Sequence, residues 1–215
     1  MHRVGGEAWG VHIAAGSDLT LALYVREALD LPTRVIVPEP LLPPVTAVKL
    51  RLSADERRSA AEDWTAWWRV LVAGRWQVLR GVPLPPGRPL DPTGADQLLL
   101  DPFRVQASSP LTAGVSAVRG AARDYLRERA EQDPRPAIGD GLDFRALVRS
   151  LARGLGRRPR DFRLQLDIVP LDGSRTWTLG IDPDGAHAWL LVTADFATHP
   201  ERHRPVITDT LTRIF

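Results

Sequence analysis

The chain has no cysteine and only one lysine, and each shortage excludes a group of chemistries. Without cysteine, the protein forms no disulfide, thiolate metal site or iron–sulfur cluster, and it has no cysteine nucleophile. Lys49 is not preceded by the glycines of a P-loop, so nucleotide hydrolysis of that type is excluded. A lysine Schiff base can form at no position other than Lys49.

Long hydrophobic runs are also missing. The run from Leu19 to Val25 is followed by Arg26 and Glu27, and it is far shorter than the roughly 18 to 20 apolar residues that span a bilayer. Residues 1–16 contain Glu7 and no continuous apolar segment, which argues against a signal peptide. We therefore predict a cytoplasmic protein that does not contact membranes.

Charge is unevenly distributed along the 215 residues, although the formal net charge is only +2. Residues 1–110 contain 12 basic and 12 acidic side chains, residues 111–163 contain 12 and 7, and residues 164–215 contain 4 and 7. The basic middle and the acidic end can neutralise each other in the folded protein, or the basic part can attract an anionic partner. The hydrophobic content (44%) and charged content (25%) are those of ordinary folded proteins.

Residues 1–80 are predicted to form a β-α-β-β-α half. Alternating or β-branched residues predict three strands, over 8–14, 34–37 and 45–52. Gly16-Ser17-Asp18 provides a cap for a helix that ends near Leu29, before Pro32.

A second helix is predicted from Ser53, whose spacing to Glu56 is that of a capping box. Gly74 is expected to end this helix, and residues 76–79 are expected to form a strand. Three tryptophans share one face of the helix: Trp64, Trp67 and Trp68. They are expected to pack in the core, or alternatively to line an apolar pocket or a protein interface.

Residues 81–110 are rich in proline. Seven prolines interrupt regular structure there: Pro83, Pro85, Pro86, Pro89, Pro92, Pro102 and Pro110. Because long irregular loops are uncommon inside compact domains, this segment is predicted to be a linker or a surface arm. Residues 111–215 then form a second unit, or they fold with residues 1–80 as a single domain.

The second half is predicted to contain a helical pair followed by a three-stranded antiparallel meander. The helices are expected from about Thr112 to Glu131 and from Phe144 onward. The strands are expected over 163–169, 176–181 and 187–193, with a turn at Asp182-Pro183-Asp184-Gly185. Pro205 is expected at the first position of a terminal helix. The fold class is therefore predicted as α+β.

Arginines recur every four residues along the helix that begins at Phe144, on the face opposite its apolar residues. Residues 145–163 contain seven arginines and one acid, Asp161. Six of the arginines form a candidate site for an anion or an acidic partner: Arg145, Arg149, Arg153, Arg157, Arg158 and Arg160. The alternative is a solvated helix whose arginines meet the acidic C-terminal segment.

The C-terminal segment contains a second candidate group, formed by His187, Asp195, His199 and His203. Histidines four residues apart on a helix can share a metal, but His199-Pro200-Glu201-Arg202-His203 does not match the H-E-x-x-H motif. We therefore expect a polar loop here, with no metal and no cofactor. A hydrolase that uses a metal or carboxylates is the alternative for these residues.

Taken together, these features favour a non-enzymatic binding or adaptor protein. It would engage a protein partner, or a second copy of itself, through the arginine-rich face or the tryptophan helix. Binding of nucleic acid through residues 145–163 is the main alternative, and hydrolysis near the C-terminal histidines is the second.

Overall fold

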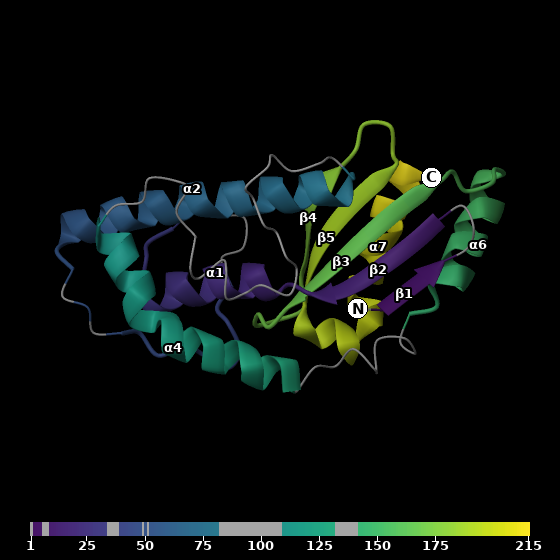
Figure 1. Cartoon of the computed structure of the whole chain (residues 1–215). Helices are drawn as coiled ribbons and strands as arrows, with labels where there is room; N and C mark the ends of the chain where they lie inside the picture. The colour runs from purple at the N-terminus through teal and green to yellow at the C-terminus, as the bar shows by residue number, and fades with distance from the viewer. Residues whose placement is uncertain are drawn as a thin grey trace. The chain divides into compact units, whose positions relative to one another are not determined.

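The computed structural model describes residues 2–5, 9–33, 39–48, 50, 52–81, 109–131 and 142–215. Within these residues, the α+β fold has five α-helices and a five-stranded mixed sheet (Figure 1). Contacts divide the chain into a sheet unit, Met1–Gly16 with Asp133–Phe215, and a helical unit, Ser17–Gln132. No α-helix in the described part is long and apolar enough to cross a membrane.

The sheet unit is built around three parallel strands. These strands are β2 (Trp9–Ala15), β3 (Phe162–Val169) and β5 (His187–Thr193). An antiparallel strand flanks them at each edge: β1 (His2–Gly5) beside β2, and β4 (Thr176–Ile181) beside β5. The order across the sheet is β1-β2-β3-β5-β4, so strands from both ends of the chain meet in one sheet.

The predicted hairpin between β4 and β5 is confirmed, but the predicted antiparallel meander is wrong. β3 pairs in parallel with β5, Leu166 opposite Leu190, and does not neighbour β4. The hairpin turn was predictable because its chemistry is local: the Gly185 N–H donates to the Asp182 carbonyl at 3.0 Å, and Gly185 has a φ of 74°. Strand direction depends on partners distant in sequence, and β3 and β5 are buried as central parallel strands usually are.

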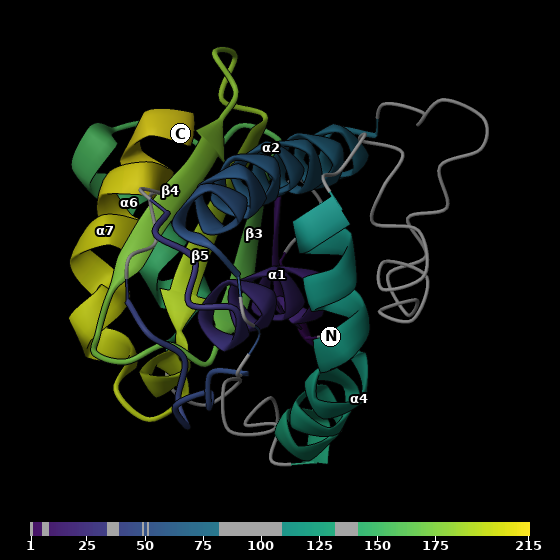
Figure 2. The same cartoon turned by 90° about the vertical axis from the view of Figure 1, so that its left-hand side faces the viewer.

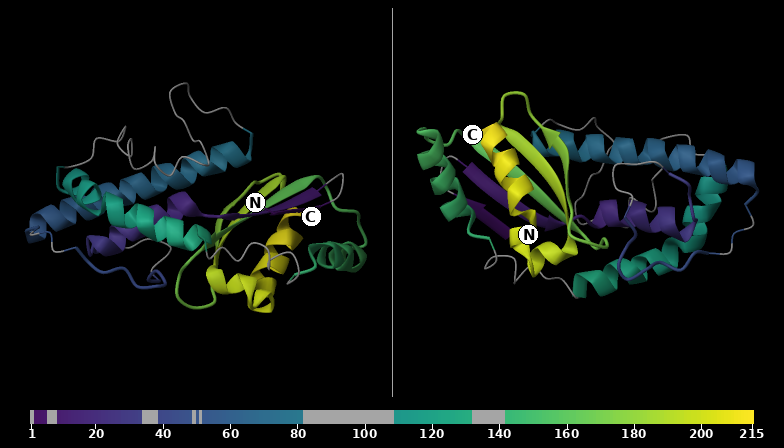
Figure 3. Two further views of the ribbon diagram at one scale, coloured as in Figure 1. Left: turned by 60° about the horizontal axis from the view of Figure 1, so that its bottom comes forward. Right: turned by 180° about the vertical axis from the view of Figure 1, so that it is seen from behind.

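One face of the sheet packs against α6 (Phe144–Leu155) and α7 (Pro200–Ile214), as Figures 2 and 3 show. Alternate strand residues form the core with them, among them Val11, Ile13, Leu164, Leu166, Leu190 and Val192. The terminal helix was expected to start at Pro205, but it begins at Pro200 and Pro205 lies inside it. Packing of Ile207, Leu211 and Ile214 in the core offsets the hydrogen bond that Pro205 cannot make.

Three helices make up the helical unit: α1 (Ser17–Ala28), α2 (Ala54–Leu79) and α4 (Ser109–Glu131). Each packs against the other two. The predicted capping box of α2 is present, because the Glu56 N–H donates to Ser53 Oγ at 3.3 Å and the Ser53 N–H donates to Glu56 Oε2 at 2.8 Å.

Two expectations for this unit are corrected. The helix does not end at Gly74 and residues 76–79 are helical, since burial of Gly74 and Leu71 outweighs the helix penalty of one glycine, about 1 kcal/mol. Residues 45–48, 50 and 52 belong to no strand, so the β-α-β-β opening is wrong there. The predicted strand over 34–37 and the prolines from Pro83 to Pro102 lie outside the described residues.

Candidate functional site

Helix α6 has clear signals at both ends. Asp143 caps it by accepting the Ala146 N–H at 2.8 Å, and Gly156 ends it with a φ of 64° while the Arg157 N–H donates to the Ala152 carbonyl at 3.2 Å. Phe144, Leu147 and Val148 are buried in the core of the sheet unit. The opposite face of α6 is therefore held outward.

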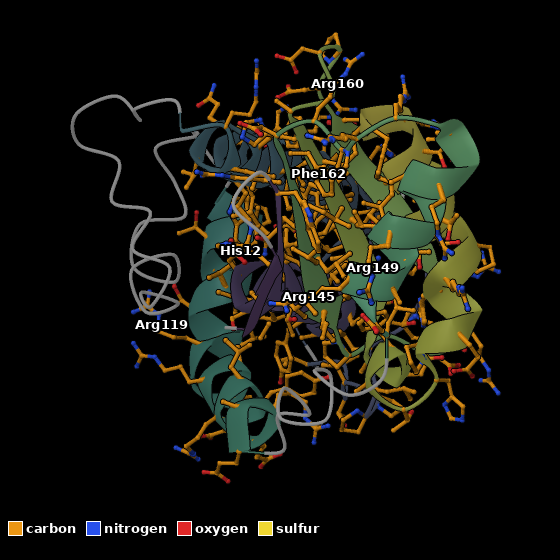
Figure 4. All side chains as sticks on the ribbon, turned by 90° about the vertical axis from the view of Figure 1, so that its right-hand side faces the viewer. His12, Arg119, Arg145, Arg149, Arg160 and Phe162 are labelled. Atoms are coloured by element: carbon orange, nitrogen blue, oxygen red, sulfur yellow. The ribbon has the colours of Figure 1, made fainter. Side chains whose placement is uncertain are left out.

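That face and the turn that follows it carry the six predicted arginines, which we call the arginine surface. Its members are Arg145, Arg149, Arg153, Arg157, Arg158 and Arg160, and all six are exposed. Figure 4 shows Arg145 and Arg149 along α6 and Arg160 in the loop beyond the other end of the helix. The structure thus shows these arginines exposed on α6 and on the segment that follows it.

Five of the six arginines have no ion-pair partner among the residues that the structure describes. Arg145 takes part in an interaction. For the other five members, no carboxylate in the described part of the chain lies within ion-pairing distance. Exposed charges without a partner remain available to an external anion.

The acidic C-terminal segment was expected to neutralise these arginines, and its described ion pairs are made elsewhere. Asp182 pairs with His187 at 3.0 Å, and Asp209 pairs with Arg213 at 2.9 Å. Asp195 contacts His203. These three acids have partners within their own segment, and none of their described contacts is with the arginine surface.

The three tryptophans of α2 lie in the interior of the helical unit. Trp64, Trp67 and Trp68 are 0%, 3% and 4% exposed. The Trp64 indole N–H donates to the Ala22 carbonyl at 2.7 Å, and its ring stacks on Trp68 with centroids 5.6 Å apart. This burial supports a packing role, and it leaves the arginine surface as the exposed member of the two predicted sites.

A hydrogen-bonded network surrounds Asp195, just beyond the end of β5. Ser174 and Thr193 donate their hydroxyl protons to the Asp195 carboxylate, and His203 Nε2 lies 3.0 Å from Asp195 Oδ1. The other imidazole nitrogen, Nδ1, lies 2.8 Å from Thr176 Oγ1. Because His203 is only 1% exposed, the network ties β4, β5 and α7 together from inside the sheet unit.

The electrostatics of Asp195 suit a structural role. Partial burial raises the pKa of this carboxyl, but hydrogen bonds from Ser174 and Thr193 and the nearby His203 hold the pKa below its usual value. In a nucleophilic triad the imidazole contacts the serine and takes its proton, whereas here Asp195 separates Ser174 from His203. A carboxylate with a lowered pKa is a weak base, so this order does not activate Ser174.

The other residues of the predicted C-terminal group lie in separate pairs. His187 contacts Asp182, and His199 Nδ1 lies 2.9 Å from Thr198 Oγ1. Among the described residues, no group of three or more histidine, aspartate or glutamate side chains is arranged to hold a metal ion. The structure joins Asp195 with His203 and does not bring the four predicted residues into one site.

Sequence reasoning missed Ser174 and Thr193 as partners of Asp195, and Thr176 as a partner of His203. Hydroxyl residues are common, and only the pairing of β4 with β5 and the docking of α7 bring these three into one network. None of the family models, curated proteins or solved structures compared with this chain matches it.

Proposed function

We propose that this protein is a non-enzymatic binding protein that engages an acidic partner through the arginine surface. One observation carries the proposal: five exposed arginines, on α6 and the turn after it, have no carboxylate within ion-pairing distance in the described part of the chain. Arginine presents a planar fork of donors that matches carboxylate and phosphate oxygens.

Several arginines must act together for such a surface to bind. A single exposed ion pair contributes only about 0–1 kcal/mol, because water and salt screen it. Arg149 and Arg153 lie about one helical turn apart on α6, and Arg157 follows directly after the Gly156 end of the helix, so one extended acidic partner can meet all three. The affinity is therefore expected to rise with the partner's number and density of negative charges.

Self-association through this surface is disfavoured. A two-fold symmetric contact places the same patch of both copies face to face, and here it would oppose two rows of arginines. Like charges at that distance repel. The proposed partner is therefore a different, acidic molecule and not a second copy of this chain.

Retention of the full-length protein on immobilised heparin, a sulfated polyanion, tests this proposal. The substitution set Arg149→Gln/Arg153→Gln/Arg157→Gln should lower the salt concentration that elutes the protein. The matched control, Arg58→Gln/Arg127→Gln/Arg213→Gln, removes the same charge from arginines that pair with acids on their own helices. Equal elution of the two variants would overturn the proposal.

A further inference from the structure

We infer that the acidic partner of the arginine surface is a nucleic acid duplex held through its phosphates, an inference that rests on the proposed function. Three features of the protein favour a phosphate backbone over an acidic protein as the partner. They are the small exposed side chains between the arginines, the close spacing of the positive charges and the burial of the nearby aromatic ring.

The exposed residues between the arginines of α6 have small side chains. Ala146, Ser150 and Gly154 are exposed and recur at the same four-residue spacing as the arginines. Protein interfaces draw most of their affinity from buried aromatic or large apolar anchors surrounded by a polar rim. On α6 the one large hydrophobic residue among the exposed ones is Leu155, at 40% exposed, so the surface has little with which to anchor a protein partner.

The positive charge is dense and continuous. Four residues of α-helix rise about 6 Å, so Arg145, Arg149 and Arg153 place one charge at about every 6 Å along the helix. Arg157, Arg158 and Arg160 continue the series past the turn at Gly156. A DNA duplex carries one negative charge per roughly 1.7 Å of its axis, so its phosphates can meet all of these positions without a special sequence.

The aromatic residues nearest in sequence favour a duplex over a single strand. Single-stranded nucleic acid is bound largely by stacking of its bases on exposed aromatic rings. Phe162, the aromatic residue that follows the arginine surface, is 2% exposed and its ring stacks on Trp9 with centroids 5.7 Å apart. The described part of this face therefore offers charge and small side chains to a backbone, and the buried Phe162 ring is closed to a base.

Contacts of this kind fix position without sequence preference. Arginine bonds to phosphate oxygens are independent of the base pairs. Binding should consequently be similar for duplexes of different sequence and should depend steeply on salt.

The test is fluorescence anisotropy of the full-length protein with a fluorescein-labelled DNA duplex of mixed sequence. If the five arginines that lack an ion-pair partner among the described residues each contact a phosphate, affinity should fall about five-hundredfold between about 50 mM and about 200 mM salt. For Arg149→Gln/Arg153→Gln/Arg157→Gln the same change in salt should lower affinity only about twelvefold, because three fewer counterions are released. The control set Arg58→Gln/Arg127→Gln/Arg213→Gln should keep the steep dependence.

Competition by poly-L-glutamate of the same total charge separates the two kinds of partner. The inference predicts that it displaces the duplex poorly. The protein could instead bind poly-L-glutamate in preference to the duplex, while Arg149→Gln/Arg153→Gln/Arg157→Gln still weakens heparin retention. That result would reject a nucleic acid as the partner and would leave the proposed function in place. If the protein does not bind the duplex, and the two sets of variants elute from heparin at the same salt concentration, both the inference and the proposed function are overturned. A salt dependence that the control set flattens as much as the α6 set also contradicts the inference.

Discussion

Helices α4 and α6 both carry arginines at four-residue spacing, yet their surfaces differ. On α4 the acids Asp124, Glu128 and Glu131 lie among the arginines, and Asp124 pairs with Arg127 at 2.7 Å. The sequence of α6 contains no acid, whereas α1, α2, α4 and α7 each contain at least one. Arginine periodicity alone does not mark a site; what distinguishes α6 is that Arg149 and Arg153 have no acid within four residues on either side.

Both helices pack through buried leucines, so the same substitution can be compared in each. Leu147 of α6 and Leu111 of α4 are both buried, and Leu→Ala at either position should lower the free energy of unfolding by about 2–5 kcal/mol, the usual cost of such a cavity. Only Leu147→Ala should also weaken heparin retention, because α6 carries the arginine surface. Urea denaturation and salt elution below the transition measure the two effects, and equal loss of retention in both variants would contradict the contrast.

A substitution in the acidic C-terminal segment tests whether Asp195 neutralises the arginine surface. Asp195→Asn should lower the free energy of unfolding at neutral pH by about 1–3 kcal/mol, since it disrupts the hydrogen bonds that Ser174, Thr193 and His203 make to the carboxylate. Heparin retention should change no more than in a variant that loses an acid elsewhere, such as Asp209→Asn. A larger gain in retention would mean that Asp195 had been neutralising the arginine surface.

The pH dependence of the same variant has a definite sign. Because the folded-state pKa of Asp195 lies below the value of about 3.9 typical of unfolded chains, its contribution to stability is present above that value and is lost as the pH falls through the folded-state pKa. The stability difference between the unsubstituted protein and Asp195→Asn should therefore shrink on acidification. A difference that grows below about pH 4 would contradict this account.

The smallest expected change in stability comes from making α6 resemble α4. Ala146→Glu with Ser150→Glu places an acid three residues before Arg149 and before Arg153, the spacing that Asp124 has to Arg127. Each new pair should add about 0.2–0.5 kcal/mol of stability. Duplex affinity should nevertheless fall, with a salt dependence shallower by about two units, because two fewer phosphates are neutralised. Thermal unfolding and anisotropy measure the two effects; unchanged affinity would mean that charge on α6 is not what binds.

Local signals predicted several helices and one hairpin. The capping box at Ser53 and the Asp182–Gly185 turn depend on residues within one turn of each other, and both are present. The direction of β3 was not predictable in this way. Trp9 of β2 pairs beside Phe162 of β3, so the parallel arrangement depends on contacts between chain segments far apart in sequence.

The sequence by itself determined the positions of Arg145, Arg149 and Arg153 on one side of α6, because 3.6-residue periodicity places them opposite Phe144, Leu147 and Val148. Only the tertiary structure decided which charges find partners. Asp182, Asp195 and Asp209 are paired within their own segment because strand pairing and the docking of α7 bring partners to them. A charge is compensated by what is near it in space, and that distance is not encoded in spacing along the chain.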